Sequence, residues 1–202
     1  MKFKIVFFTT VIFVTSLVLF KMFYRPLDNS AIPEEQKPQV TKKGYLIKAP
    51  DIPTNLTFAG EQVPVHYYDV RERLDRELLV NKYWHSATFQ LIKRANRFFP
   101  TIEKILKEEG IPDDIKYLAV AESGLQNVVS PSGAAGFWQF LKGAAADFGL
   151  EVNSEIDERY HLEKATRAAC KYLKWNYEKF GSWALAAAAY NYGRSAVIRQ
   201  ME

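Results

Sequence analysis

From Asp69 onward, apolar residues recur at helical spacing, and this pattern restricts the fold more than any other feature of the sequence. Glycine, proline and capping residues divide the region into amphipathic segments, and no run alternates apolar and polar residues as a strand ladder would. The pattern therefore predicts an all-α domain. The expected helices are residues 69–84, 86–99 with Ser86 as N-cap and Pro100 as terminator, 101–110, 112–124, 161–181 and 182–193.

One of these helices carries a carboxyl group on its apolar face. Pro112 and the two aspartates after it are typical of a helix start, and Gly124 is typical of a helix end. One face of this helix holds, at i, i+3, i+4 and i+7, the residues Ile115, Leu118, Ala119 and Glu122. A carboxylate there costs free energy unless it is paired with a cation or keeps its proton. Glu122 is therefore either a core carboxyl paired with Arg or Lys, or a group with a chemical role.

The N-terminal region is of a different kind. Residues 5–20 carry no charge and stand between Lys4 and Lys21, so residues 1–23 are expected to form a transmembrane anchor or a signal segment. The anchor is favoured because no typical cleavage site follows the run, although secretion to the periplasm after cleavage is the alternative. Residues 24–65 contain six of the nine prolines and no helical periodicity, which predicts a Pro-rich linker. The helical domain is then expected over residues 66–202.

Composition excludes several classes of site. The net charge of +4 is mildly basic and suits an anionic polymer, but no dense Lys/Arg run with interleaved aromatic residues indicates nucleic acid binding. Cys170 is the single cysteine, so no internal disulfide is expected, and three dispersed histidines form no typical ligand pair. We expect neither a metal nor a cofactor.

Three short motifs in order carry a resemblance to a known family. They are AESG around Glu122, GFWQF at residues 136–140 and AAYNYG at residues 188–193, with a Gly/Ser loop at residues 130–136 and IDERY at 156–160. Together they resemble the catalytic domain of the lytic transglycosylases of peptidoglycan, with most similarity to the membrane-bound lytic murein transglycosylase D group, over about residues 70 to 198. GFWQ departs from the Gly-Leu-Met-Gln of many relatives. The resemblance implies a lysozyme-like (goose-type) helical fold.

The resemblance also implies roles for individual residues. Glu122 would protonate the glycosidic oxygen between N-acetylmuramic acid and N-acetylglucosamine, and would then act as base on the 6-hydroxyl of the muramyl sugar to close a 1,6-anhydro ring. The apolar setting of this carboxyl agrees with such a role, because burial raises the pKa of a carboxyl group. The expected substrate-binding residues are Ser123, Gln139, Tyr190 and Asn191. The side-chain amide of Gln139 is expected to donate to an acetamido or ring oxygen of the sugar.

Several positions keep a structural interpretation beside the functional one. Ser123 is equally well explained as a helix-end serine, and Asn191 could cap a helix end. The three aromatic residues of GFWQF are expected in the core more than at a sugar platform. Glu158 and Arg159 match an acidic-basic pair of the family, and we expect a structural ion pair there.

Two other functions stay open at this point. A lysozyme-type hydrolase on the same fold would need a second carboxylate, for which Asp147, Asp157 and Glu158 are the candidates downstream of Glu122. A catalytically weak peptidoglycan-binding module is the non-enzymatic alternative. In each case the expected partners are glycan strands and, through residues 1–23, a membrane. The expected location is the bacterial cell envelope, with the domain anchored at the inner membrane and facing the periplasm.

The C-terminal residues raise a further expectation. RSAVIRQME, residues 194–202, has helical spacing and ends after two turns. In the resembling family the chain continues with more helix and a further tyrosine. We therefore expect a C-terminally incomplete domain with apolar surface uncovered beside Trp183 and Tyr190.

Overall fold

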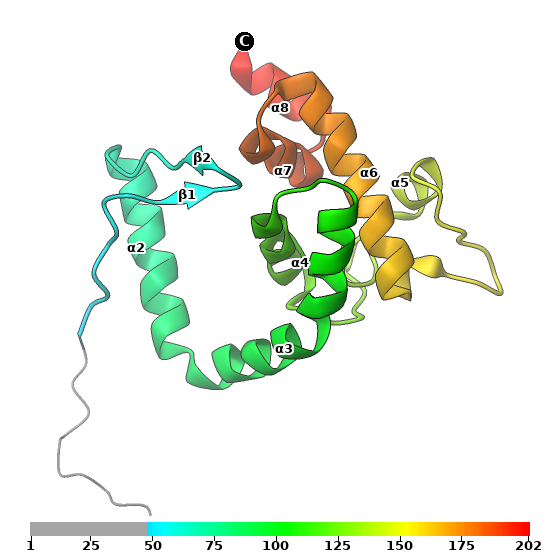
Figure 1. Cartoon of the computed structure of the whole chain (residues 1–202), viewed down its shortest axis with the longest axis horizontal. Coiled ribbons are helices and arrows are strands. Elements are labelled where there is room, and N and C mark those ends of the chain that lie inside the picture. The colour runs from blue at the N-terminus through cyan, green and yellow to red at the C-terminus, as the bar shows by residue number, and fades with distance from the viewer. Residues whose placement is uncertain (1–47) are drawn as a thin grey trace, which may run out of the picture. The chain divides into compact units, whose positions relative to one another are not determined.

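The computed structural model describes residues 48–202, which form one compact, mostly helical unit. It begins with a hairpin of two short antiparallel strands, β1 (Thr57–Phe58) and β2 (Glu61–Gln62). The α-helices are α2 (Tyr68–Tyr83), α3 (His85–Glu108), α4 (Lys116–Ser123), α5 (Lys142–Asp147), α6 (Leu162–Phe180), α7 (Trp183–Tyr192) and α8 (Arg194–Met201). Two 3-10 turns, η3 (Asp113–Ile115) and η4 (Glu158–Tyr160), precede α4 and α6 (Figure 1). The all-α expectation is thus confirmed at the level of a mostly helical chain.

The expected membrane segment and most of the expected linker, up to residue 47, lie outside the described residues. Within residues 48–202 no helix has both the length and the apolar character needed to cross a bilayer.

Helix α3 corrects the prediction that Pro100 ends a helix. A single helix runs from His85 to Glu108 with Pro100 inside it, and Ser86 is not its N-cap, since Trp84 holds that position. Proline in a helix interior costs about 3 kcal/mol because it removes one hydrogen bond and crowds the preceding turn. The turn after Pro100 buries three large side chains, each of which contributes roughly 1.5 to 3 kcal/mol: Ile102, Ile105 and Leu106. Packing therefore outweighs the proline.

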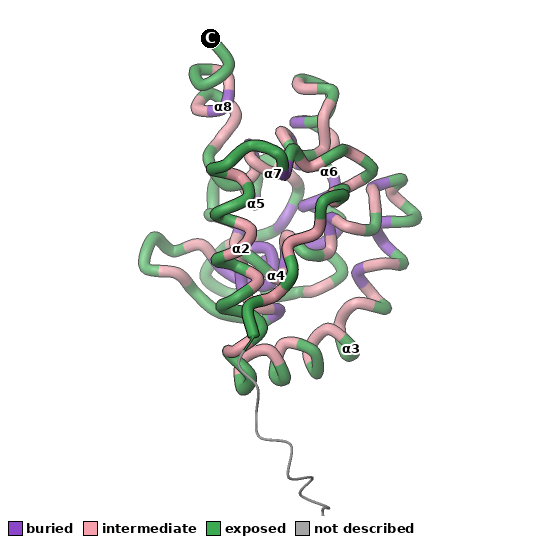
Figure 2. Tube along the Cα trace, turned by 90° about the vertical axis from the view of Figure 1, so that its left-hand side faces the viewer, coloured by how far each residue is buried: buried purple, intermediate pink, exposed green. Residues whose placement is uncertain are grey.

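The same proline explains the shape of α3. In Figure 1 the ribbon of α3 bends sharply between a first half that follows α2 and a second half that runs beside α4. Such kinks are typical of an interior proline. The first half has only exposed and half-buried residues, as Figure 2 shows, whereas the second half enters the core.

The core is built around α6, which packs against both α7 and α3. Its inner face consists largely of small residues, which let the neighbouring helices approach closely: Ala165, Thr166, Ala168, Ala169 and Cys170. Leu173 and the aromatic residues Phe137, Trp138 and Phe140 fill the space between α6 and the segment that follows α4. The ends of α6 and α7 agree with the sequence, since Gly181 ends α6 with φ +64° and Ser182 caps α7.

The hairpin differs from what the sequence predicted for residues 24–65. Residues 48–65 belong to the same compact unit as the helices, so the last part of the expected linker is instead part of the domain. The Glu61 carboxylate accepts hydrogen bonds from Ser182 Oγ (2.6 Å) and from the backbone N–H of Trp183, at the start of α7. The backbone N–H of Ala59 donates to Asp114 Oδ2 (2.8 Å). The composition of residues 24–65 could not predict this packing, because the hairpin is held by residues far away in the sequence.

Candidate active site

A cavity of about 550 Å³ opens on one side of the domain. Its walls come from four parts of the chain: the end of α4, the segment from residue 130 to α5, the middle of α6, and the end of α7. Four of the five residues that the sequence proposed for the site lie in these walls: Glu122, Gln139, Tyr190 and Asn191. Ser123, the fifth proposed residue, does not line the cavity.

Glu122 lies in the last turn of α4 and is half-buried at the cavity wall. Burial raises the pKa of its carboxyl group above the ordinary value, and a hydrogen bond with the Asn191 side chain opposes part of that shift. Among the described residues no Lys, Arg or His forms an ion pair with Glu122. The alternative of a core carboxyl neutralised by a cation therefore finds no support, and the group holds its proton to higher pH than a solvated glutamate.

Ser123 follows Glu122 and is buried. Its hydroxyl lies 2.8 Å from the carbonyl oxygen of Phe137, to which it donates, and it accepts from the backbone N–H of Gln126 at 3.2 Å. Ser123 thus links the end of α4 to the segment that carries Gln139. The geometry favours the structural interpretation, because the hydroxyl group is already used inside the protein.

Gln139 lies in a tight turn with φ +49°, a conformation that is uncommon outside glycine. Its side-chain amide Nε2 donates to the carbonyl oxygens of Gly136 (2.8 Å) and Val128 (3.0 Å). The sequence argument expected this amide to donate to the substrate. In the structure the two N–H donors hold the loop, and the acceptor oxygen Oε1 is the part of the side chain that is left for a ligand.

Tyr190 and Asn191 stand side by side near the end of α7. The Tyr190 hydroxyl donates to the carbonyl oxygen of Trp138 at 2.7 Å, and burial, together with the nearby Glu122 carboxyl, raises its pKa well above the ordinary value. The Asn191 side chain forms the hydrogen bond with Glu122. One residue of the pair therefore fixes α7 to the loop, and the other contacts the candidate acid.

Comparison with known proteins shows the family of the chain. Residues 99–202, just over half of the chain, match the transglycosylase SLT domain. The chain belongs to this family. Membrane-bound lytic murein transglycosylase D from Escherichia coli K12 and its counterpart from E. coli O6:H1 are each 27% identical to the chain over 135 residues. These alignments cover 66% of this chain and 29% of each relative, so the chain spans less than a third of the relatives it matches.

The aromatic residues of GFWQF lie in the core of the SLT domain, as the sequence predicted. Trp138 is fully buried, and its indole N–H donates to Thr166 Oγ1 at 2.9 Å. Phe137 packs edge-on against Phe98, with ring centroids 4.9 Å apart. Phe140 is also buried, although its edge reaches the cavity wall.

An ion pair between Arg159 and Asp157 supports the GFWQF loop, in place of the Glu158–Arg159 pair that the sequence predicted. Arg159 is buried and pairs with Asp157 (2.6 Å), while it donates to the carbonyl oxygens of Gly133 and Phe140. Glu158 pairs with Lys164 instead. The expected pair between Glu158 and Arg159 is therefore wrong, although each residue forms a structural ion pair with another partner.

The cavity also exposes side chains that the sequence argument did not select. Tyr172, from the middle of α6, lines the wall beside Tyr190, and their ring centroids are 5.0 Å apart. Tyr192 is 76% exposed at the rim, and Ser130 and Ser132 border the opening. Helical spacing alone cannot separate Tyr172 from a core aromatic, and only its place beside AAYNYG in the fold reveals it. Within residues 48–202, no cluster of three or more His, Cys, Asp or Glu residues is placed to hold a metal ion.

Proposed function

We propose that this SLT domain is a lytic transglycosylase that cleaves the β-1,4 bond between N-acetylmuramic acid and N-acetylglucosamine in peptidoglycan and leaves a 1,6-anhydromuramyl end. One observation carries the proposal. The described side chains that line the cavity include a single carboxyl group, Glu122, and burial raises its pKa. A reaction in which one carboxyl acts first as acid and then as base needs no second carboxylate.

The mechanism follows from the proton of Glu122. In the first step the protonated carboxyl gives its proton to the glycosidic oxygen, the bond from that oxygen to C1 breaks, and the N-acetylglucosamine unit leaves as an alcohol. In the second step the resulting carboxylate takes the proton of the muramyl 6-hydroxyl, and the 6-oxygen bonds to C1. The proton returns to Glu122, and no water is consumed.

Asn191 supports both steps. A hydrogen bond from its side-chain amide favours the charged form of the carboxyl group, which appears only after the first proton transfer. Burial favours the neutral form, which is needed before that transfer. The two effects shift the pKa of Glu122 in opposite directions. We infer that this balance lets the group first donate a proton and then accept one. Tyr190 contributes by fixing the end of α7 from which Asn191 projects.

The lysozyme-type hydrolase is less well supported. Its second carboxylate would have to face the cavity, but Asp157 is paired with Arg159 and Glu158 with Lys164. Asp147 is exposed on α5, and none of the three lines the cavity. The peptidoglycan-binding alternative keeps the cavity but assigns no function to the raised pKa of Glu122.

The setting that we propose is the cell envelope. The helical arrangement is taken to be lysozyme-like, in keeping with the SLT family, and residues 1–23 are proposed to anchor the chain at the inner membrane with the domain facing the periplasm. A mildly basic chain suits a glycan whose peptide stems carry carboxylates.

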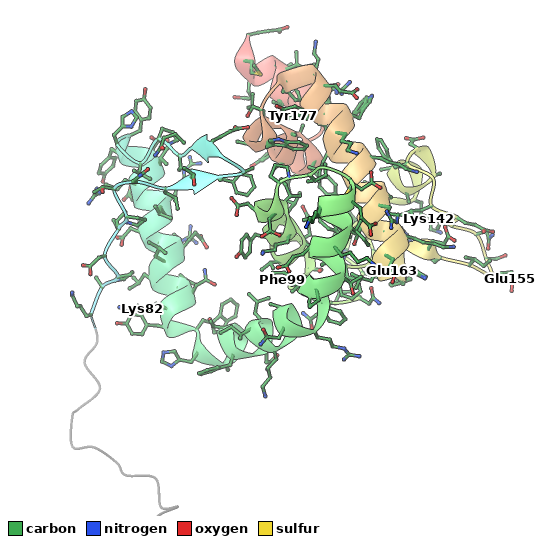
Figure 3. The ribbon with its side chains drawn as sticks, in the orientation of Figure 1. Lys82, Phe99, Lys142, Glu155, Glu163 and Tyr177 are labelled. Atoms are coloured by element: carbon green, nitrogen blue, oxygen red, sulfur yellow. The ribbon has the colours of Figure 1, made fainter. Side chains whose placement is uncertain are left out.

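The test is digestion of purified sacculi by the 202-residue chain, with mass spectrometry of the products. We expect anhydromuramyl ends, and we expect Glu122→Gln to lower the rate by at least about 10² to 10⁴, the value of general acid-base catalysis. Glu155→Gln is the control, because Glu155 is an exposed loop carboxyl that Figure 3 places at the far tip of the domain. Products with only reducing muramic acid ends would favour the hydrolase. Unchanged cleavage by a folded Glu122→Gln variant would remove Glu122 from the mechanism.

A further inference from the structure

Three tyrosines line the cavity: Tyr192 stands at its rim, while Tyr172 and Tyr190 lie side by side in its wall. The two wall hydroxyls differ in whether the protein itself accepts their protons. The hydroxyl of Tyr190 donates to the carbonyl oxygen of Trp138, so its proton is used inside the protein. No described acceptor receives the proton of Tyr172. The ring of Tyr172 is nevertheless held firmly, because it stacks on Phe148 with centroids 4.6 Å apart and contacts Tyr190 on another side.

Behind Tyr172, one turn further along α6, lies a fully buried amide. Asn176 accepts a hydrogen bond at its oxygen Oδ1 from Arg194 Nε at 3.4 Å. Its nitrogen Nδ2 is the one buried side-chain polar atom of residues 48–202 that lacks a hydrogen-bond partner. A buried amide without a partner costs roughly 1 to 3 kcal/mol, so its surroundings require an explanation.

Arg194 fixes the orientation of that amide. Its guanidinium group stacks on the ring of Trp175, 3.1 Å from the centroid, and Nη2 donates to the carbonyl oxygen of Trp175. A guanidinium group can only donate, so it must face the amide oxygen and turn Nδ2 away from itself. Asn176 follows Tyr172 by four positions on α6, so the two side chains are neighbours on one face of the helix. Burial raises the pKa of Tyr172, and the neighbouring Asn176 amide opposes part of that shift.

These positions restrict the hydrogen bonds that the row can form. Arg194 donates to the oxygen of Asn176, and the nitrogen of Asn176 can only donate toward the oxygen of Tyr172. An oxygen that accepts from Nδ2 keeps its own proton for another acceptor. Tyr172 lines the cavity, so that acceptor lies on the side of a bound molecule.

We propose that Tyr172 is a substrate-contacting hydrogen-bond donor in the cavity, and that Asn176 and Arg194 are positioning residues that keep its O–H directed at an acceptor oxygen of the bound N-acetylated glycan. This inference rests on the proposed function and adds a specific contact to it. The contact forms when the glycan binds and is retained during cleavage. Its loss therefore raises KM and leaves kcat unchanged.

Tyr172→Phe tests the contact, since it keeps the ring and its stacking and removes only the hydroxyl group. We expect KM for glycan cleavage, and Kd for the hexamer of N-acetylglucosamine measured in the Glu122→Gln background, to rise by about 3- to 10-fold, the value of one neutral hydrogen bond. Tyr177→Phe is the matched control on the same helix. Figure 3 shows Tyr177 where α6 runs beside α7, and its ring stacks on Trp183 outside the cavity.

Asn176→Asp tests the positioning. A carboxylate at this place pairs with Arg194 and accepts from the Tyr172 hydroxyl, so the proton of Tyr172 turns away from the cavity. Asn176→Asp should therefore weaken glycan binding as much as Tyr172→Phe does, and the double variant should be no weaker than either single variant. If Asn176→Asp does not melt cooperatively, Asn176→Ala takes its place and should lie between the wild type and Tyr172→Phe.

The outcomes separate this inference from the proposed function. Cleavage by the wild type with unchanged KM and Kd in Tyr172→Phe would overturn the role of Tyr172 and leave the proposed function standing. Additive losses in the double variant would overturn the positioning role of Asn176. A wild-type chain that neither cleaves sacculi nor binds the hexamer would overturn both proposals.

Discussion

Replacing Gly136 by alanine would place a methyl group in the space that the backbone of Arg159 already occupies. A Cβ atom built on Gly136 would lie 1.9 Å from the carbonyl oxygen of Arg159 and 2.7 Å from its carbonyl carbon. Gly136 also has φ +81°, a conformation that costs an L-residue roughly 1 to 2 kcal/mol. Forced overpacking adds typically about 1 to 3 kcal/mol. We therefore expect Gly136→Ala to lower the free energy of unfolding by about 2 to 5 kcal/mol.

Gly133→Ala supplies the control for this magnitude. Gly133 has the same φ of +81°, but a Cβ there would meet no atom within 4 Å. The two variants share the conformational cost, and only Gly136→Ala adds the overlap with Arg159. For a domain of this size about 1 kcal/mol lowers Tm by roughly 2 to 4 °C, so Gly136→Ala should melt about 4 to 20 °C below the wild type and clearly below Gly133→Ala.

The assay is thermal unfolding followed by circular dichroism, with sacculus digestion measured on protein that is still folded. Because Gln139 donates to the carbonyl oxygen of Gly136, a shift of this segment should also lower activity below the melting transition. Equal Tm values for Gly136→Ala and Gly133→Ala would refute the reasoning, since the close approach to Arg159 would then carry no cost.

Three further variants follow from the electrostatics. Because burial raises the pKa of Glu122, the wild type loses stability as pH rises from about 4.5 through the pKa of the folded state. Glu122→Gln lacks this loss, so its Tm should equal that of the wild type at pH 4 and exceed it at pH 8. Glu61 has its pKa lowered, because the hydrogen bonds from Ser182 and the start of α7 outweigh burial. Glu61→Gln should cost about 1 kcal/mol at pH 7, and the difference should shrink as pH falls through the carboxyl pKa, in melts recorded between pH 3 and 7. Asp157→Asn leaves the buried Arg159 without its carboxylate and should cost roughly 3 to 5 kcal/mol by urea unfolding.

The helix of Glu122 was predictable because its signals are local. Pro112, the acidic first turn and Gly124 mark both ends, and the apolar spacing assigns Glu122 to the inner face. The direction of its pKa shift follows from that face alone. Glu122 and Asn191 are far apart in the sequence, so local signals could not predict that they contact each other. Only the resemblance of their motifs to a known family assigned both residues to one site.

The errors have one cause, which is that non-local packing overrides local preference. Pro100 is a strong local stop, yet the burial of the following turn keeps α3 continuous. Residues 57–62 have the composition of a linker, yet Glu61 finds its partners more than a hundred residues later. Gln139 was expected to donate to the substrate, but the loop's own carbonyl groups take both donors, which no pattern in GFWQF indicates.

Helix α7 is fixed at both ends, and this has a consequence for how the site meets its substrate. Glu61 holds its first N–H groups, while Tyr190 binds the carbonyl oxygen of Trp138 near its last turn. The helix has ten residues and is about 15 Å long, so it cannot slide by one residue without losing both attachments. Asn191 therefore stands beside Glu122 before any glycan arrives. If Glu122 is the acid that we propose, it and Asn191 need no reorganisation when a ligand binds, so none of the free energy of association is spent on assembling the site.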